Sequence, residues 1–309
     1  MSRTCAILGA PIETGASQRG CLMGPASLRT AEIDSELRAL GWDVTDLGDV
    51  TIAPVAPQTH ANPALHHLAE TSAWITALQK AAFEAGKTCD VPIFLGGDHS
   101  MAAGTVPAMA RRAADEGRPL FVLWLDAHPD MHTLATTESG NLHGTPAAYF
   151  TAQEDCEAYP ALGHAVDPAN ICMMGIRSVD QAERERIKKI GLEVHDMRAI
   201  DETGVLPPLQ AFLERVKAAN GMLHLSFDVD FLDPSIAPAV GTTVPGGATF
   251  REAHLIMETL CDSGLVTSLD LVELNPFLDE RGRTAVLLCD LTASLFGRRV
   301  MDRMTRSFG

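Results

Sequence analysis

Three ionisable residues follow directly on an apolar run. The run from Leu120 to Leu125 ends in Asp126, His128 and Asp130, which are spaced two residues apart. In a β-strand, side chains two residues apart point to the same side, so the three groups are expected to converge. Unpaired charges are costly to bury, and a bound cation would compensate them.

The same arrangement recurs after other apolar runs. Asp228 and Asp230 are again two residues apart, His99 follows the run that ends in two glycines, and Glu273 follows a fourth run. Because ligands of open parallel sheets bind at the carboxyl ends of the strands, we expect these clusters to meet at one edge. A single Asp after a strand usually caps a helix or a turn, which is our interpretation of Asp98 and Asp233.

The donor types indicate the class of metal. The candidate ligands are four carboxylates and two imidazoles, without a thiolate: His99, Asp126, His128, Asp130, Asp228 and Asp230. Such a set favours Mn²⁺ or another hard to borderline divalent ion over structural zinc. Six side chains serve two ions if two carboxylates bridge, and two metals about 3.5–4 Å apart can hold a hydroxide nucleophile at neutral pH. The predicted chemistry is hydrolysis.

Short apolar runs that alternate with helical patterns must position these groups. The runs are nearly continuous in hydrophobicity, which is typical of parallel strands covered on both faces. We expect strands at 5–11, 43–48, 91–97, 120–126, 171–177, 192–197, 223–230 and 266–276, and helices at 65–85, 249–264 and 283–297. The prediction is one α/β domain over residues 1–309, a three-layer α/β/α sandwich around an eight-stranded parallel sheet.

Composition limits the partners. The formal net charge is −16 and no basic cluster offsets it, which argues against nucleic acid. No stretch approaches the roughly 18 apolar residues that a membrane span requires. The N-terminal apolar run is too short for a signal peptide, and the seven cysteines lack paired spacing. These features predict a cytoplasmic protein in a reducing compartment.

Long motifs that span nearly the whole chain carry a family resemblance. They are "GGDHS", "DAHPD", "TTESGNLHGTP", "SFDVDFLDP", "GTTVPGG" and "LVELNPFLDERGRTA", in this order. With them the sequence resembles the ureohydrolase family of arginases and agmatinases, and within it the arginases. The resemblance implies a sheet edge with two Mn²⁺ ions that share Asp126 and Asp228. One ion would be held by His99, Asp126, Asp130 and Asp228, and the other by Asp126, His128, Asp228 and Asp230.

The resemblance also implies roles around the metals. Asp130 would accept the nucleophile's proton, His143 matches the family's proton-shuttle histidine, and Glu273 matches the carboxylate that orients the guanidinium group, with Thr242 nearby. The positions that meet the amino-acid end of the substrate are Thr137, Ser139, Asn141, Asp180 and Glu183.

Two positions depart from the arginase pattern. His132 stands where arginases commonly carry an asparagine that binds the α-carboxylate, and Ser178 stands where an aspartate is common. A histidine can still donate to a carboxylate, so we expect His132 to contact the substrate.

The expected reaction is hydrolysis of L-arginine to L-ornithine and urea. The alternatives are hydrolysis of agmatine or a guanidino acid, a deacetylase-like amidohydrolase with one zinc, and a metal-binding protein without activity. The family assembles as trimers or hexamers, so a homotrimer or homohexamer is expected.

Overall fold

One parallel β-sheet dominates the structure. The computed structural model describes residues 3–302. The strands are β1 Thr4–Ala10, β2 Asp43–Asp49, β3 Val91–Gly96, β4 Leu120–Leu125, β5 Ile171–Ile176, β6 Glu193–Asp196, β7 Met222–Asp228 and β8 Val266–Val272. Their order is β2-β1-β3-β8-β7-β4-β5-β6, and each neighbouring pair is parallel. All eight predicted strands are confirmed, although β7 ends at Asp228 rather than 230 and β8 ends at Val272 rather than 276.

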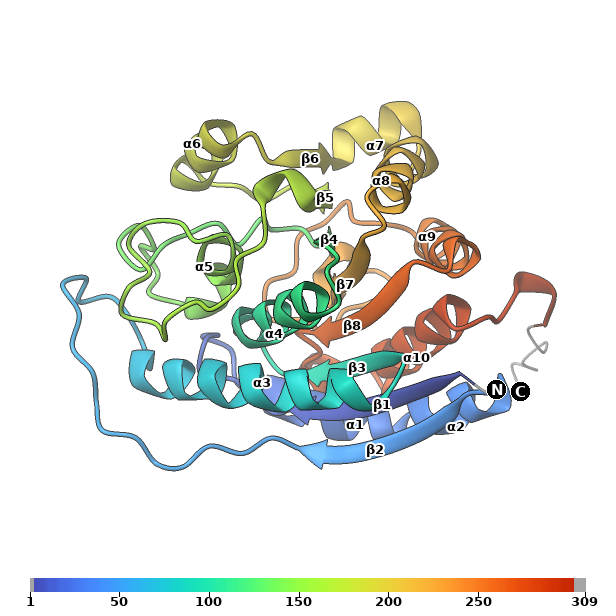
Figure 1. Ribbon diagram of the computed structural model, residues 1–309, viewed down its shortest axis with the longest axis horizontal. Helices are drawn as coiled ribbons and strands as arrows, with labels where there is room; N and C mark the ends of the chain where they lie inside the picture. The colour runs from blue at the N-terminus through green and yellow to red at the C-terminus, as the bar shows by residue number, and fades with distance from the viewer. Residues whose placement is uncertain (1–2, 303–309) are drawn as a thin grey trace.

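Helices cover both faces of this sheet (Figure 1). They are α1 Gly24–Thr30, α2 Ile33–Ala39, α3 Leu68–Thr88, α4 Ala102–Asp115, α5 Pro146–Phe150, α6 Gln181–Ile190, α7 Met197–Thr203, α8 Leu206–Ala218, α9 Phe250–Ser263 and α10 Arg283–Leu295. Buried residues of α1, α2, α8, α9 and α10 share one apolar cluster with the sheet, and those of α3 and α4 share another. The three-layer architecture is therefore confirmed.

The alternation of side chains along each strand explains the continuous hydrophobic runs. In β4, Leu123 and Leu125 pack in the first apolar cluster, whereas Val122 and Trp124 pack in the second. All four side chains are fully buried, because each face of the strand meets a helical layer. Such a strand tolerates charge only where it ends, which is where the ionisable residues begin.

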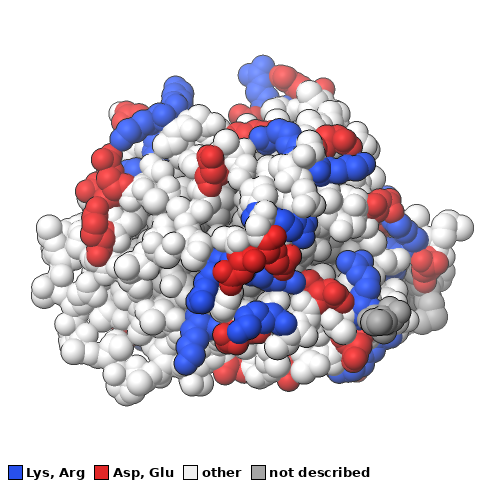
Figure 2. All heavy atoms as spheres, in the orientation of Figure 1, with Lys and Arg blue, Asp and Glu red and all other residues white. Residues whose placement is uncertain are grey.

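Charged side chains are unevenly distributed over the surface. On the face drawn in Figure 2, basic and acidic residues intermingle on the right and along the top, and the lower left is largely uncharged. Figure 1 places α5 and the long loop before α3 in that uncharged part. Within residues 3–302, no helix combines the length and apolar character needed to cross a membrane.

Helix α9 begins with a capping box formed by Thr249 and Glu252. The Thr249 hydroxyl accepts from the Glu252 amide at 3.3 Å, and the Glu252 carboxylate accepts from the Thr249 amide at 2.8 Å. The helix ends at Gly264, which has a left-handed φ of 64°. The side chain of Thr249 thus satisfies a backbone donor that the first turn leaves without a partner.

Replacing the cap should destabilise the protein without touching the site. We expect Thr249→Ala to lower the free energy of unfolding in urea by about 1 kcal/mol, because the first turn of α9 loses its acceptor. Thr259→Ala is the matched control in the same helix, where the hydroxyl donates back to the Leu255 carbonyl. Equal loss of stability in the two variants would contradict the capping role of Thr249.

Candidate metal centre and active site

Four adjacent strands deliver the predicted ligands to one edge of the sheet. The order β3-β8-β7-β4 places the carboxyl ends of these strands side by side. His99 follows β3, Glu273 follows β8, Asp228 ends β7 and Asp126 follows β4. The predicted meeting of the clusters is confirmed, and its cause is topological, because parallel neighbours end at the same edge.

His99 lies among three carboxylates. Its Nδ1 is 3.0 Å from Oδ2 of Asp126, 3.0 Å from Oδ2 of Asp228 and 3.3 Å from Oδ2 of Asp130. These four side chains are buried. Ligand atoms of His99, Asp126 and Asp130 all lie within 4.8 Å of one another, close enough to bind one cation.

A second group forms around His128. Its Nδ1 is 3.0 Å from Oδ2 of Asp230 and 3.6 Å from Oδ1 of Asp126. Ligand atoms of these three residues also lie within 4.8 Å of one another. Asp126 therefore presents one oxygen to each histidine, which is the arrangement expected of a carboxylate shared by two ions.

The electrostatics of the two groups fit a cation. Nδ1 of His99 and Oδ2 of Asp126 are buried and form no hydrogen bond with any described residue, although they are 3.0 Å apart. Burial, and next the charge of Asp126, raises the pKa of Asp130 well above its ordinary value. Burial lowers the pKa of each imidazole, but Asp126 raises that of His99 to about 9 and Asp230 raises that of His128 to about 12. Protons must neutralise this site unless metal ions do, so the donor set suits divalent cations.

Neighbouring groups hold the ligands in orientation. Nε2 of His99 lies 2.9 Å from the Ser226 hydroxyl, and the imidazole stacks on the indole of Trp124 at 4.0 Å between ring centroids. These contacts leave Nδ1 facing the carboxylates, as metal-binding histidines require. Asp230 accepts from the Ala127 amide at 3.0 Å and from the Thr242 hydroxyl at 3.1 Å.

Glu273 is bound to histidines on two segments. Its Oε1 accepts from the backbone amide of His99 and pairs with Nδ1 of His143, each at 2.8 Å. Burial opposes the charge of Glu273, but His143 lowers the pKa of this carboxyl below its ordinary value. The sequence identified both Glu273 and His143 as site residues, but it did not predict their direct contact. The backbone of Glu273 is left-handed, with φ of 64°, and that of Asp130 also, with φ of 49°.

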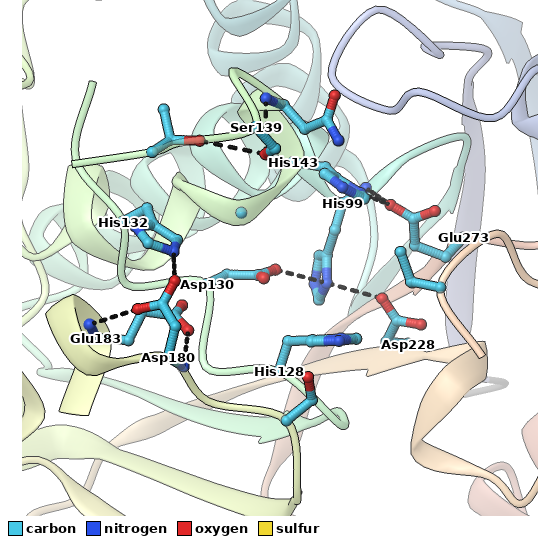
Figure 3. Close-up of a pocket in the computed structure, with 15 residues that line it drawn as sticks. His99, His128, Asp130, His132, Ser139, His143, Asp180, Glu183, Asp228 and Glu273 are labelled. Carbon is cyan, nitrogen blue, oxygen red and sulfur yellow. Dashed lines mark hydrogen bonds and ion pairs between the residues drawn. The ribbon is translucent and has the colours of Figure 1, made fainter. Parts of the chain in front are cut away.

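A cavity of about 200 Å³ opens beside the metal ligands (Figure 3). Every residue predicted to contact the substrate lines it: His132, Thr137, Ser139, Asn141, Asp180, Glu183, Thr242 and Glu273. His143 and Ser178 line it too. Figure 3 shows His132, Asp180 and Glu183 on the side of the cavity opposite Glu273.

The acidic pair in this cavity is fixed by its helix. Asp180 and Glu183 form the capping box of α6, and Glu183 also accepts from the Met131 amide at 3.1 Å. Nε2 of His132 lies 2.6 Å from Oδ2 of Asp180, and its Nδ1 lies 3.2 Å from the Thr136 hydroxyl. The sequence predicted these residues as substrate contacts without revealing the ion pair between His132 and Asp180.

Asp98 has the local role that its position suggests. It is the N-cap of the turn η2 (His99–Met101), where its Oδ1 accepts from the Ser100 amide at 3.0 Å. Its Oδ2 accepts from the Gly15 amide at 2.7 Å, which ties the N-terminal segment to the site. The interpretation of Asp98 as a cap is confirmed.

Comparisons with known proteins agree on one family. The model of the Arginase family matches residues 3–297. The arginases of Agrobacterium fabrum and Brucella melitensis are 62% and 63% identical, over 99% and 98% of this chain and 94% and 99% of their own lengths. The crystal structure of arginase from Bacillus caldovelox has a TM-score of 0.88 at 36% identity and covers 97% of this chain and all of its own. The chain therefore belongs to the arginase family of hydrolases.

Proposed function

We propose that the protein hydrolyses L-arginine to L-ornithine and urea at a centre of two Mn²⁺ ions. The observation that carries the proposal is the position of Asp126, with one oxygen toward His99 and the other toward His128, beside a cavity that also contains Glu273. The names of the similar proteins support arginine as the substrate.

The ligands divide between two positions. One ion would be held by His99, Asp126, Asp130 and Asp228, and the other by Asp126, His128, Asp228 and Asp230. When bound, the two ions supply hydroxide at neutral pH and positive charge that stabilises the tetrahedral intermediate. The carboxylates carry four negative charges, which two divalent cations balance.

Side chains around the cavity perform the remaining steps. Glu273 binds and orients the cationic guanidinium group, whose fork of N–H donors matches a carboxylate. Asp130 accepts the proton of the nucleophile and passes it to the leaving amine as the bond from the guanidinium carbon to the substrate's side-chain nitrogen breaks. His143, in contact with Glu273, exchanges protons between the site and bulk water.

The opposite end of the cavity would hold the amino-acid part of arginine. Asp180 and Glu183 receive the α-amino group, and Ser139 and Asn141 donate to the α-carboxylate. His132 donates to the same carboxylate once its Nε2 leaves Asp180. Thr137, whose hydroxyl lies 3.4 Å from that of Ser139, completes this wall. The two ends of the cavity thus complement the two charged ends of the substrate.

A second candidate is another guanidino compound. His132 and Ser178 depart from the arginase pattern in the part of the cavity assigned to the amino-acid end. A solved proclavaminate amidino hydrolase from Streptomyces clavuligerus has a TM-score of 0.72 at 25% identity, so a protein of similar fold bears the name of a different substrate.

The four buried carboxylates disfavour the alternative of a deacetylase-like site with one zinc ion, because a single zinc ion requires fewer carboxylate ligands.

We also propose one catalytic domain over residues 1–309, a cytoplasmic location, and assembly as a homotrimer or homohexamer.

Urea release tests the proposed activity directly. The purified protein with Mn²⁺ should release urea from L-arginine with a kcat/KM well above that for agmatine, because agmatine lacks the α-carboxylate. Metal-free protein is the control and should release none. A higher kcat/KM for agmatine would show that agmatine, not arginine, is the substrate. Release of urea from neither compound would contradict the proposed activity.

Asp126→Asn should weaken metal binding at the proposed centre. Because Asp126 faces both histidines, its loss of charge should reduce bound manganese, measured by elemental mass spectrometry after dialysis, from two ions per chain to one or none. Asp233→Asn is the control, since Asp233 caps a turn through the Ser235 and Gly246 amides. Retention of two tightly bound ions by Asp126→Asn would contradict its role as the shared ligand.

His132→Ala should weaken the binding of arginine but not that of agmatine. If His132 donates to the α-carboxylate, its loss should raise the KM for arginine about tenfold, as expected for a hydrogen bond to a charged group, and leave the KM for agmatine unchanged. His132→Asn, which restores a donor at this position, should recover most of the loss. An equal rise in KM for both substrates would contradict this role and would indicate that the cavity wall around Asp180 had changed its structure.

A further inference from the structure

A buried thiol touches the carboxylate that the mechanism assigns to the guanidinium group. Cys21 begins the short turn η1 (Cys21–Met23) and is fully buried. Its Sγ lies 3.6 Å from Oε2 of Glu273, within hydrogen-bonding distance for sulfur. No step of the proposed mechanism uses this thiol.

The segment that carries Cys21 is locked against the strand ends. Gly20 has φ of 128°, and a Cβ there would lie 2.1 Å from Oδ1 of Asn275. A Cβ on Gly24 would lie 2.5 Å from the carbonyl oxygen at the end of β3. Asn275 lies two residues after Glu273, and its Nδ2 donates to the Arg19 carbonyl at 2.9 Å. These close approaches hold Cys21 beside Glu273 more tightly than a free loop would.

The two oxygens of Glu273 have different partners. Oε1 meets the His99 amide and His143, whereas the thiol of Cys21 is the hydrogen-bond donor to Oε2 among the described residues. A carboxylate oxygen can accept two hydrogen bonds, so one weak S–H donor leaves room for a guanidinium N–H. Glu273 lines the cavity and Cys21 does not, so the thiol contacts the carboxylate on the side away from the cavity.

The thiol is suited to donate. Burial, and next the negative charge of Glu273, raises the pKa of Cys21 far above its ordinary value, so the sulfur keeps its proton. The backbone of Glu273 occupies the left-handed region, which is unfavourable for a residue with a side chain and persists only where surrounding contacts enforce it. The Glu273 amide donates to the Gly97 carbonyl at 2.7 Å, and Cys21 contacts the side chain.

We propose that Cys21 is a positioning residue for substrate binding: its S–H donates to Oε2 of Glu273 and fixes the plane in which this carboxylate meets the guanidinium group. The role rests on the proposed function, because it acts through Glu273 on the substrate. It predicts that the hydrogen-bond donor at position 21, rather than the volume of the side chain, sets the affinity for the guanidinium group.

Variants that separate donor from volume test this role. Cys21→Ala and Cys21→Val lack a donor, and Cys21→Ser keeps one. The KM for arginine and the inhibition constant of guanidinium ion should both rise about threefold to tenfold in Ala and Val, the range for one lost hydrogen bond. Both constants should stay within about twofold of the wild type in Ser, while Tm falls in Ser as well as in Ala because both lose the buried sulfur.

Cys289→Ala is the matched control. Cys289 is also a buried thiol, and among residues 3–302 its Sγ has one hydrogen-bond partner, the Leu28 carbonyl at 3.7 Å. It should lower Tm and leave both constants unchanged. Equal constants in Cys21→Ala and Cys21→Ser, or losses that follow Tm across all four variants, would overturn the positioning role. Urea release by the wild type decides the proposed function separately, since an active wild type with unaffected Cys21 variants refutes only the role of Cys21.

Discussion

The close packing of buried carboxylates is the constraint on which the rest of the structure depends. Oxygens of Asp126, Asp130 and Asp228 all lie within 3.3 Å of one imidazole nitrogen of His99, and all four residues are buried. Like charges this close repel one another, and they stay together only because two positive ions or several protons neutralise them. The covered parallel sheet supplies the rigid frame that keeps them in place.

The topology of the sheet meets this constraint with little local strain. Each ligand-bearing segment leaves one of four adjacent parallel strands, so the side chains arrive from one edge without long loops. Eight non-glycine residues of the described part of the chain have a positive φ, and two of them lie at the site. Asp130 and Glu273 adopt left-handed backbone conformations, and both are carboxylates that must turn back toward the cavity after their strands end. The Glu273 amide donates to the Gly97 carbonyl at 2.7 Å, and the His99 amide and Cys21 contact its carboxylate.

Patterns with a short period could be predicted from the sequence, whereas contacts between distant segments could not. The strands follow from continuous apolar runs, and the ligand groups follow from pairs such as Asp228 and Asp230 at strand ends. The capping box of Thr249 and Glu252 is equally local. By contrast, the bond between His143 and Glu273 joins residues 130 positions apart, and the contact of Cys21 with Glu273 joins residues 252 apart. No periodic signal encodes these pairs, because they depend on where the loops pack above the sheet.

The most direct test of the proposed two-metal centre is the anomalous diffraction of manganese in crystals grown with Mn²⁺. The proposal predicts two peaks about 3.5–4 Å apart, with the carboxylate of Asp126 between them. One ion should lie beside Nδ1 of His99 and the other beside Nδ1 of His128. A single peak at full manganese occupancy, or two peaks that do not share Asp126, would contradict a centre built around this carboxylate.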